Sequence, residues 1–436
     1  MAEALPCDRK LGACMGEWQG RLVDYFCVCG VDPEDAASQE LIQSNAAVTP
    51  RVLQYYPAVP RADFAAAEFA DALPIFCFPD GDLRAQPAPT RPGVFSLICS
   101  EPDGQRYYAF VLSYSVRARS APAGWAQAFL PTCWVIVSHW PFFEQFRLAL
   151  LELYRLAWRA CPATWSSHVV QLCDEIPLPP RGQLKVTSVF FEQLLVFSRP
   201  PVNRLPMLDG THLARLFTCL SPENVLQLVA SLATEQRVVL LSEERETLTM
   251  VAQAALLLLF PFCEWPHALI TVLPTSLADY LHAPVPYLIG LEVESEDDFV
   301  ATGLWKGADC TCFDLRADKV TFHPRQPPPD IPEHQAAKLL QACRASVLAV
   351  EGRAARERAL HRGTDTAQLQ VDNVAGEHTW APEQEAELGL SWIATEIGTR
   401  MMGSNSERLA DGSDGADIMT VRCVRHACCR LDASIR

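Results

Sequence analysis

The sequence lacks a long hydrophobic run and any excess of basic residues. Its longest apolar stretch, Met250 to Cys263, is followed by Glu264 and is too short to span a membrane. Met1 to Pro6 carries an acidic residue and no long apolar segment, so we expect no secretory signal and a cytoplasmic location. The net charge of −16 argues against extensive binding to nucleic acid or anionic lipid, although it leaves room for a local basic patch.

Motifs of the common nucleotide-binding and hydrolytic enzymes are also missing. The chain has no G-x-x-x-x-G-K-[ST] loop, no G-x-G-x-x-G after a strand, no H-E-x-x-H, no G-x-S-x-G and no kinase signature set. Ser138 and His139 are adjacent on a predicted strand, where neighbouring side chains point to opposite faces, so they form no catalytic dyad. We therefore expect no catalytic residue, cofactor or metal ion, and the absences favour a binding module.

Cysteine, by contrast, is abundant, with 17 residues scattered mostly through apolar runs. The pairs Cys27/Cys29 and Cys310/Cys312 lie two residues apart, which places both members of each pair on one face of a strand. A metal site needs about four ligands at suitable spacing. We expect reduced, buried thiols that pack as small hydrophobic groups.

Strand-forming residues dominate the first third of the chain. Asp103-Gly104 lies between two such segments, as in a β-hairpin. A helix with one apolar face follows from Phe143 to Trp158. The pattern predicts a mostly antiparallel sheet, with this helix packed on it, built from Val23–Gly30, Pro74–Pro79, Val94–Ser100, Arg106–Ser115 and Thr132–Ser138.

The strongest periodic pattern covers residues 213–291. Ser221-Pro222-Glu223 is typical of a helix start, with a capping hydroxyl, a proline and then an acid at the positive end of the helix dipole. Helices and short buried strands then alternate, which predicts a parallel or mixed sheet covered on both faces. The predicted elements are Arg237–Ser242, Thr247–Leu259, Ala268–Leu273 and Tyr287–Leu291.

Three segments resemble the DENN family of Rab exchange factors. The first combines Pro74–Pro79 (PIFCFP), the hairpin and Val135–Phe146 (VIVSHWPFFEQF), and the third is Phe313–Val320 (FDLRADKV) with the prolines that follow. The second is the most specific, because a long match keeps its order and spacing. It comprises Leu216–Leu232 (LFTCLSPENVLQLVASL), Glu235–Ser242 (EQRVVLLS) and Leu273–Gly290 (LPTSLADYLHAPVPYLIG).

The resemblance covers roughly residues 20–350 and implies an α/β protein built as a two-lobed DENN module. The N-terminal lobe would be longin-like, and the second a three-layer α/β DENN lobe. We expect five parts: 15–165 upstream DENN lobe, 166–206 proline-rich connector, 207–292 central DENN core, 293–400 partial or diverged downstream segment and 401–436 disordered tail. Within the connector, Val186–Phe197 could hold an element of its own. Within the downstream segment, His334–Gly352 is expected to form a helix.

Functionally, the resemblance implies a guanine nucleotide exchange factor for a Rab-family GTPase, recruited to vesicle or endosomal membranes through the Rab. Exchange needs no covalent chemistry, because the factor stabilises the nucleotide-free GTPase. Two alternatives stay open. One is a non-catalytic scaffold, and the other is a GTPase-activating protein, for which Arg117 and Arg119 are candidate arginine fingers.

Candidate contacts with the Rab come from three short segments. Aromatic residues after a strand could anchor a partner, and polar residues in turns could bind one. The alternatives are a core position for the neighbouring Phe143 and Phe146, a solvated turn for the second segment and a local cap for Asp279. The candidates are Trp140, Phe142, Glu235, Gln236, Arg237, Asp279 and Tyr280.

Overall fold

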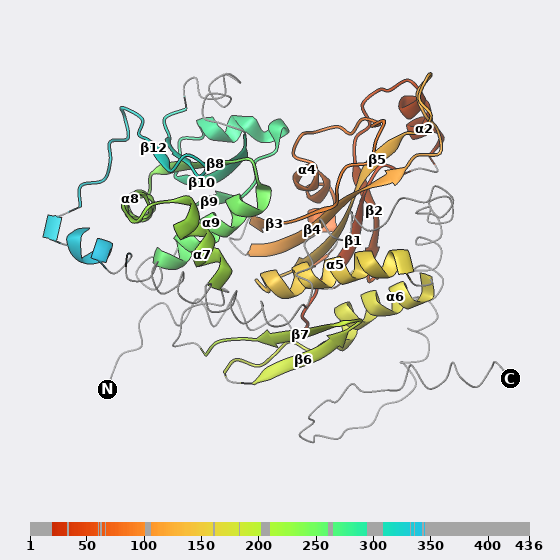
Figure 1. The fold of residues 1–436 in the computed structure, drawn as a ribbon, viewed down its shortest axis with the longest axis horizontal. Helices are drawn as coiled ribbons and strands as arrows, with labels where there is room; N and C mark the ends of the chain where they lie inside the picture. The colour runs from red at the N-terminus through yellow and green to blue at the C-terminus, as the bar shows by residue number, and fades with distance from the viewer. Residues whose placement is uncertain are drawn as a thin grey trace, which may run out of the picture.

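The chain folds into two α/β lobes that lie side by side (Figure 1). The expected tail and most of the expected downstream segment, including most of the helix at His334–Gly352, lie outside the described residues. The computed structural model describes residues 20–32, 35–59, 61, 63–65, 67–100, 106–159, 162–182, 184–201, 210–259, 265–293, 308–331, 333–334, 336–341 and 344.

The first lobe is built on a five-stranded antiparallel sheet, as predicted. Its strand order is β2-β1-β5-β4-β3, and each neighbouring pair runs antiparallel. Strand β2 is an edge strand that the sequence pattern did not predict. The strands are β1 Tyr25–Gly30, β2 Arg51–Tyr56, β3 Gly93–Ser100, β4 Arg106–Arg117 and β5 Phe129–Ser138.

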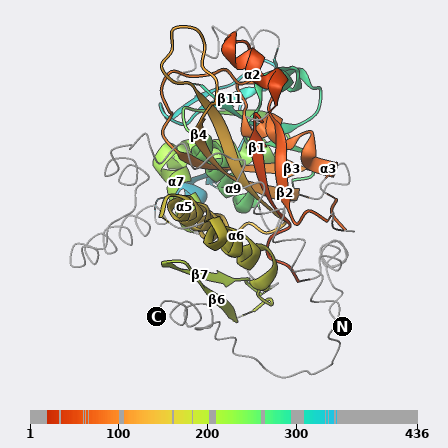
Figure 2. The same ribbon diagram turned by 90° about the vertical axis from the view of Figure 1, so that its right-hand side faces the viewer.

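Helices and a small hairpin cover one face of this sheet in two successive layers. Helices α5 (Phe143–Arg159) and α6 (Pro162–Val170) pack directly on the sheet, and the π-helical turn η1 (Gln171–Glu175) continues α6. The hairpin of β6 (Lys185–Phe190) and β7 (Gln193–Ser198) lies beyond them, so the helices are sandwiched between sheet and hairpin (Figure 2).

Short helices cover the opposite face of the first sheet. They are α2 (Ala36–Gln43), α3 (Ala67–Ala70) and α4 (Leu73–Cys77). The predicted strand at Pro74–Pro79 is therefore wrong. Pro74 occupies the first turn of α4, a position where the missing proline N–H costs no hydrogen bond, so proline starts a helix here.

The second lobe holds a mixed five-stranded sheet, as predicted. The order is β12-β11-β8-β10-β9, in which the four strands β11, β8, β10 and β9 are parallel and β12 pairs antiparallel with β11. Within the described chain, these strands are β8 Arg237–Ser242, β9 Ala268–Ile270, β10 Tyr287–Glu292, β11 Thr311–Asp314 and β12 Lys319–Thr321.

Both faces of the second sheet are covered, because its strands alternate between two apolar cores. Val238 and Leu240 face helices α7 (Gly210–Cys219), α8 (Pro222–Ala233) and α9 (Arg245–Leu259). Val239 and Leu241 face the 3-10 helix η2 (Thr275–His282).

Within the described residues, no single helix is long and apolar enough to cross a membrane. One pair, Thr211–Cys219 with Pro222–Ala233, reaches that length and apolar character only when joined, and its helices are bent by 109°.

Helix α8 begins where the sequence predicts, but another residue caps it. The predicted cap hydroxyl, Ser221 Oγ, donates to Asp318 instead of accepting from the helix, at 3.2 Å. Asp318, in the turn between β11 and β12, also accepts from Ser221 N–H at 2.8 Å and from Asn224 Nδ2 at 2.7 Å. A distant carboxylate thus lies at the positive end of the helix and ties α8 to the edge of the sheet.

The expected burial is confirmed for the described cysteines except Cys219, which is partly exposed. Cys27 and Cys29 share one core and Cys310 and Cys312 another, as their spacing requires. All four are free, buried thiols.

Gly290 in β10 supplies the first testable consequence. A Cβ at this position would lie 2.0 Å from the backbone oxygen of Thr271, so a side chain forces two strands apart. We expect Gly290→Ala to lower the free energy of unfolding in urea by about 1–3 kcal/mol, the usual cost of overpacking. Gly93→Ala is the matched control, because a Cβ there meets nothing within 4 Å. Equal stabilities of the two variants would contradict this account.

Candidate partner-binding surface

The two lobes meet where edge strand β3 lies against α9 and the end of β9. Thr249 Oγ1 in α9 donates to the Ser96 carbonyl at 2.6 Å, and the Ile98 N–H donates to Thr271 Oγ1 at 3.2 Å. One apolar cluster runs through this contact and contains Leu97 together with residues of both sheets. The backbone of the edge strand is therefore used by the second lobe, and the lobes form one packed unit.

A second set of contacts closes the junction at the carboxyl end of the second sheet. Arg245, at the start of α9, pairs with Asp80 of the first lobe at 3.0 Å and with Glu292 of β10 at 2.5 Å. Its guanidinium also lies 5.4 Å from the centre of the Phe95 ring. Sequence reasoning missed Arg245, because neither its partners nor its position at the junction follows from local pattern.

Helix η2 starts at the same junction and then crosses the outer face of the second sheet. Thr275 N–H donates to the Pro79 carbonyl at 2.8 Å, which fixes the start of η2 against the first lobe. At its other end, Leu281 is buried, and its carbonyl accepts from the Tyr287 hydroxyl at 2.9 Å. Both ends of η2 are thus held, one by each lobe.

The predicted contact residues Asp279 and Tyr280 lie on the exposed side of η2. Tyr280 is 49% exposed, as is Val285 shortly after η2 ends, and Asp279 is exposed between the anchored ends. An exposed aromatic ring on a segment fixed at both ends is suited to bind a partner, because little conformational freedom is lost on binding.

The other predicted polar turn lies at a different edge of the sheet. Glu235 and Gln236 precede β8 and Arg237 is its first residue, so this turn is at the amino end of the strand. Arg245 and Glu292 are at the carboxyl ends of strands. Gln236 Nε2 donates to the Pro327 carbonyl at 3.1 Å.

Two ion pairs complete the contacts of this turn. Arg237 pairs with Asp309 at 3.6 Å, and Glu235 pairs with His267 at 3.3 Å. Internal contacts to the proline-rich segment and to the strand starts thus account for the three residues of the turn.

Trp140 and Phe142 are buried, so the expectation of an exposed aromatic anchor needs correction. Trp140 is 7% exposed and Phe142 is 2% exposed. The Trp140 indole N–H donates to the Arg21 carbonyl at 3.2 Å, and the Arg199 guanidinium lies 4.0 Å from the ring centre. Phe142 packs on Phe197 of β7 with ring centres 5.1 Å apart. Tight packing of the hairpin against α5 fills the space in which a partner would have to bind.

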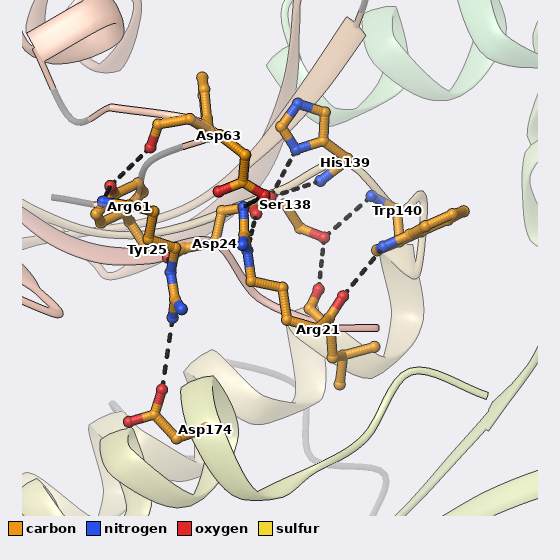
Figure 3. Close-up of polar contacts among 11 residues, drawn as sticks. Arg21, Asp24, Tyr25, Arg61, Asp63, Ser138, His139, Trp140 and Asp174 are labelled. Atoms are coloured by element: carbon orange, nitrogen blue, oxygen red, sulfur yellow. Dashed lines mark hydrogen bonds and ion pairs between the residues drawn. The ribbon is translucent and has the colours of Figure 1, made fainter. Parts of the chain in front are cut away.

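A polar network holds the segment between β5 and α5 against the start of β1 (Figure 3). Asp24, beside the start of β1, accepts from the His139 backbone N–H at 3.0 Å and lies 2.7 Å from its Nδ1. The same carboxylate accepts from Arg21 Nε at 2.6 Å. Ser138 Oγ donates to the Leu22 carbonyl at 2.7 Å, so its partner differs from that of the His139 ring. Ser138 and His139 have separate partners, as the alternation of a strand predicts, and form no dyad.

Loop and helix residues extend this network across the first lobe. Arg61 Nε donates to the Asp24 carbonyl at 2.8 Å, and Arg61 also pairs with Asp174 of η1 at 3.4 Å (Figure 3). Arg21 pairs with Asp63 at 2.8 Å. Partial burial acts to raise the pKa of Asp63, but the hydrogen bond and charge of Arg21 lower it overall. The network fixes the turn from β5 into α5, and its polar groups form hydrogen bonds and ion pairs with one another.

Glu246, in α9, is a titratable group at the junction. Ser96 Oγ donates to its carboxylate at 3.2 Å. Burial raises the pKa of Glu246, although the Ser96 hydrogen bond and the charges of His212 and Arg147 act in the opposite direction. Its contribution to stability is present below the ordinary glutamate pKa and is lost as the pH rises through the higher value of the folded state.

We therefore expect Glu246→Gln to gain stability over the wild type as the pH rises from 5 to 8. The measurement is urea unfolding of both proteins across that range. Glu40→Gln, at an exposed position of α2, is the matched control for the same change of side chain. A pH-independent difference for Glu246→Gln would show that ionisation of Glu246 does not destabilise the junction.

Comparison with known proteins places this architecture in a family. The sequence profile of the DENN (AEX-3) domain matches residues 129–318, from β5 to the turn after β11. The uDENN domain profile matches residues 50–114 of the first sheet.

Individual relatives agree with the two profiles. The DENN domain and WD repeat-containing protein SCD1 of Arabidopsis thaliana is 27% identical over 303 residues, covering 65% of this chain and 25% of that protein. DENN domain-containing protein 2B of Homo sapiens is 29% identical over 299 residues, covering 67% and 24% respectively. The chain thus spans about a quarter of the length of the curated relatives it matches. Both lobes carry a matching DENN-type profile, and the chain belongs to the DENN-domain family.

Proposed function

We propose that the chain binds a Rab-family small GTPase and promotes release of its GDP in membrane traffic. Membership of the DENN-domain family supports this proposal, because the family resemblance implies Rab exchange factors. The observation that supports a specific contact surface is η2, an exposed segment with an aromatic residue that is fixed to the first lobe at its start and to the second lobe at its end.

The proposed contact surface consists of Asp279, Tyr280 and Val285, with Asp80 at the adjoining margin of the first lobe. Asp80 pairs with Arg245, yet its side chain is 84% exposed and remains accessible. Tyr280 and Val285 offer apolar area, and the two carboxylates suit hydrogen-bond donors of a partner.

The proposed mechanism is selection of one state of the GTPase. The switch loops of a GTPase are ordered by contacts with the nucleotide phosphate and Mg²⁺. A preformed surface that binds the loops only when these contacts are broken lowers the free energy of the nucleotide-free state and speeds GDP loss. Because the β3 backbone is hydrogen-bonded to threonine hydroxyls of the second lobe, we expect the surface to be in place before binding, without closure of the lobes.

The first test is release of fluorescent GDP from a panel of purified Rab proteins, with and without the chain. We expect strong acceleration for one Rab or a closely related subset. Measurement of GTP hydrolysis on the same panel separates the alternatives. Faster hydrolysis without faster GDP release would identify a GTPase-activating protein, and binding without either effect would identify a scaffold.

The second test removes the proposed anchors. We expect Tyr280→Ala and Val285→Ala each to reduce GDP release from the responding Rab, with about tenfold loss for the tyrosine, as for a central aromatic contact. Val59→Ala is the matched control for Val285→Ala, because Val59 is 65% exposed and lies away from η2 in the first lobe. Unchanged release by both η2 variants, with folding intact, would move the contact surface elsewhere.

A further inference from the structure

The β6–β7 hairpin has an apolar outer face as well as an apolar inner face. Phe190, Leu195 and Phe197 point inward and are buried against α5 and α6. On the other side, Val189 and Leu194 face each other across the two strands, and each is 58% exposed. A hairpin with one solvated face normally carries polar side chains there, so this outer face is unusual.

The apolar area extends beyond that one cross-strand pair. Leu184, just before β6, is 68% exposed, and half-buried Val196 continues the row along β7. Internal packing does not explain the exposed side chains, because the hairpin is already fixed through its other face. Gln145 of α5 donates to the Val196 carbonyl at 3.2 Å, and Gln171 donates to the Val189 carbonyl at 3.1 Å.

The charge of this segment differs in sign from that of the chain. Residues 181–199 contain Arg181, Lys185 and Arg199 but one acid, Glu192. The segment therefore carries +2, whereas the whole chain carries −16. Lys185 lies on the outer face, two residues from Thr187 and four from Val189, and both Lys185 and Arg181 are exposed.

From these observations we infer that the outer face of the hairpin binds an anionic membrane surface. Leucine and valine side chains enter the boundary between headgroups and acyl chains, while flanking basic groups attract anionic lipid within a Debye length. The acidic remainder of the chain is repelled by the same surface, so the electrostatic field favours the orientation in which the hairpin faces the lipid.

A second copy of the chain is a poorer occupant of this face. Pairing two hairpins about a two-fold axis buries the same patch of both copies in one interface, which places the basic side chains of both copies there. A phospholipid surface instead supplies the opposite charge. It also adapts to the two-stranded hairpin without needing a complementary shape.

Co-sedimentation of the full chain with phospholipid vesicles tests this inference. We expect binding to vesicles of phosphatidylcholine with phosphatidylserine, and much weaker binding to phosphatidylcholine alone. The double variant Val189→Asp/Leu194→Asp should lose about tenfold or more of the binding, because it replaces the inserted groups with charges of the wrong sign. Lys185→Glu should weaken binding to anionic vesicles and reduce its salt dependence.

Val285→Asp is the matched control, since Val285 is similarly exposed but lies near η2. It should keep vesicle binding and lose GDP release in solution, whereas the hairpin variant should show the reverse, so the two proposals fail separately. Urea unfolding verifies that each variant is folded.

Several outcomes would overturn the inference. They are absence of vesicle binding by the wild type, equal binding to neutral and anionic vesicles, and unchanged binding by the hairpin variant. A dimer in light scattering that the hairpin variant dissociates would assign this face to a second copy instead.

Discussion

The contact of β3 with the second lobe is the constraint on which the remaining structure depends. An edge strand normally exposes a row of unpaired backbone groups. Here the Ser96 carbonyl accepts from Thr249, and the Ile98 N–H donates to a threonine of the second lobe, Thr271. The apolar side chains of the strand join a core that both sheets share. Hydrogen bonding of the β3 backbone and burial of its apolar side chains thus join the two lobes into one unit.

The same contact determines where the exposed features lie. Gly290 permits Thr271 to approach β10 closely, and Thr271 in turn reaches β3. The chain then passes directly into η2, whose start is fixed against Pro79 of the first lobe. The position of Tyr280 therefore depends on this series of contacts. A surface built in this way holds its shape before any partner arrives, which is the property that selective stabilisation of one GTPase state requires.

Sequence reasoning succeeded where a single local pattern decides the structure. The continuous apolar run Arg237–Ser242 is β8, and the helical spacing from Phe143 is α5. It failed at Pro74–Pro79, because a short apolar segment between prolines fits either a strand or a helical turn, and proline at the first turn selected the helix.

For the binding surface, a different factor limits what the sequence can predict. Trp140 was assigned by its aromatic character, but exposure depends on what packs against it. The hairpin and Arg199 cover it from a distant part of the chain. Asp279 and Tyr280 were predicted because the family motif includes them, and both are exposed, while Arg245 was not predicted because its two partners are 165 and 47 residues away. A local sequence pattern can predict secondary structure, whereas the exposure and ion pairing of a side chain depend on how the two lobes pack.

The arrangement of the two proposed surfaces bears on how they would act together. The GTPase surface is carried by η2 of the second lobe, and the lipid surface by the hairpin that forms the outermost layer of the first (Figures 1 and 2). Because they are on different lobes, a membrane and a GTPase do not compete for the same residues. The junction at β3 fixes their mutual geometry, so contact with lipid at the hairpin also sets the orientation of η2. Simultaneous engagement raises the effective concentration of a membrane-bound GTPase at η2 without any new protein contact.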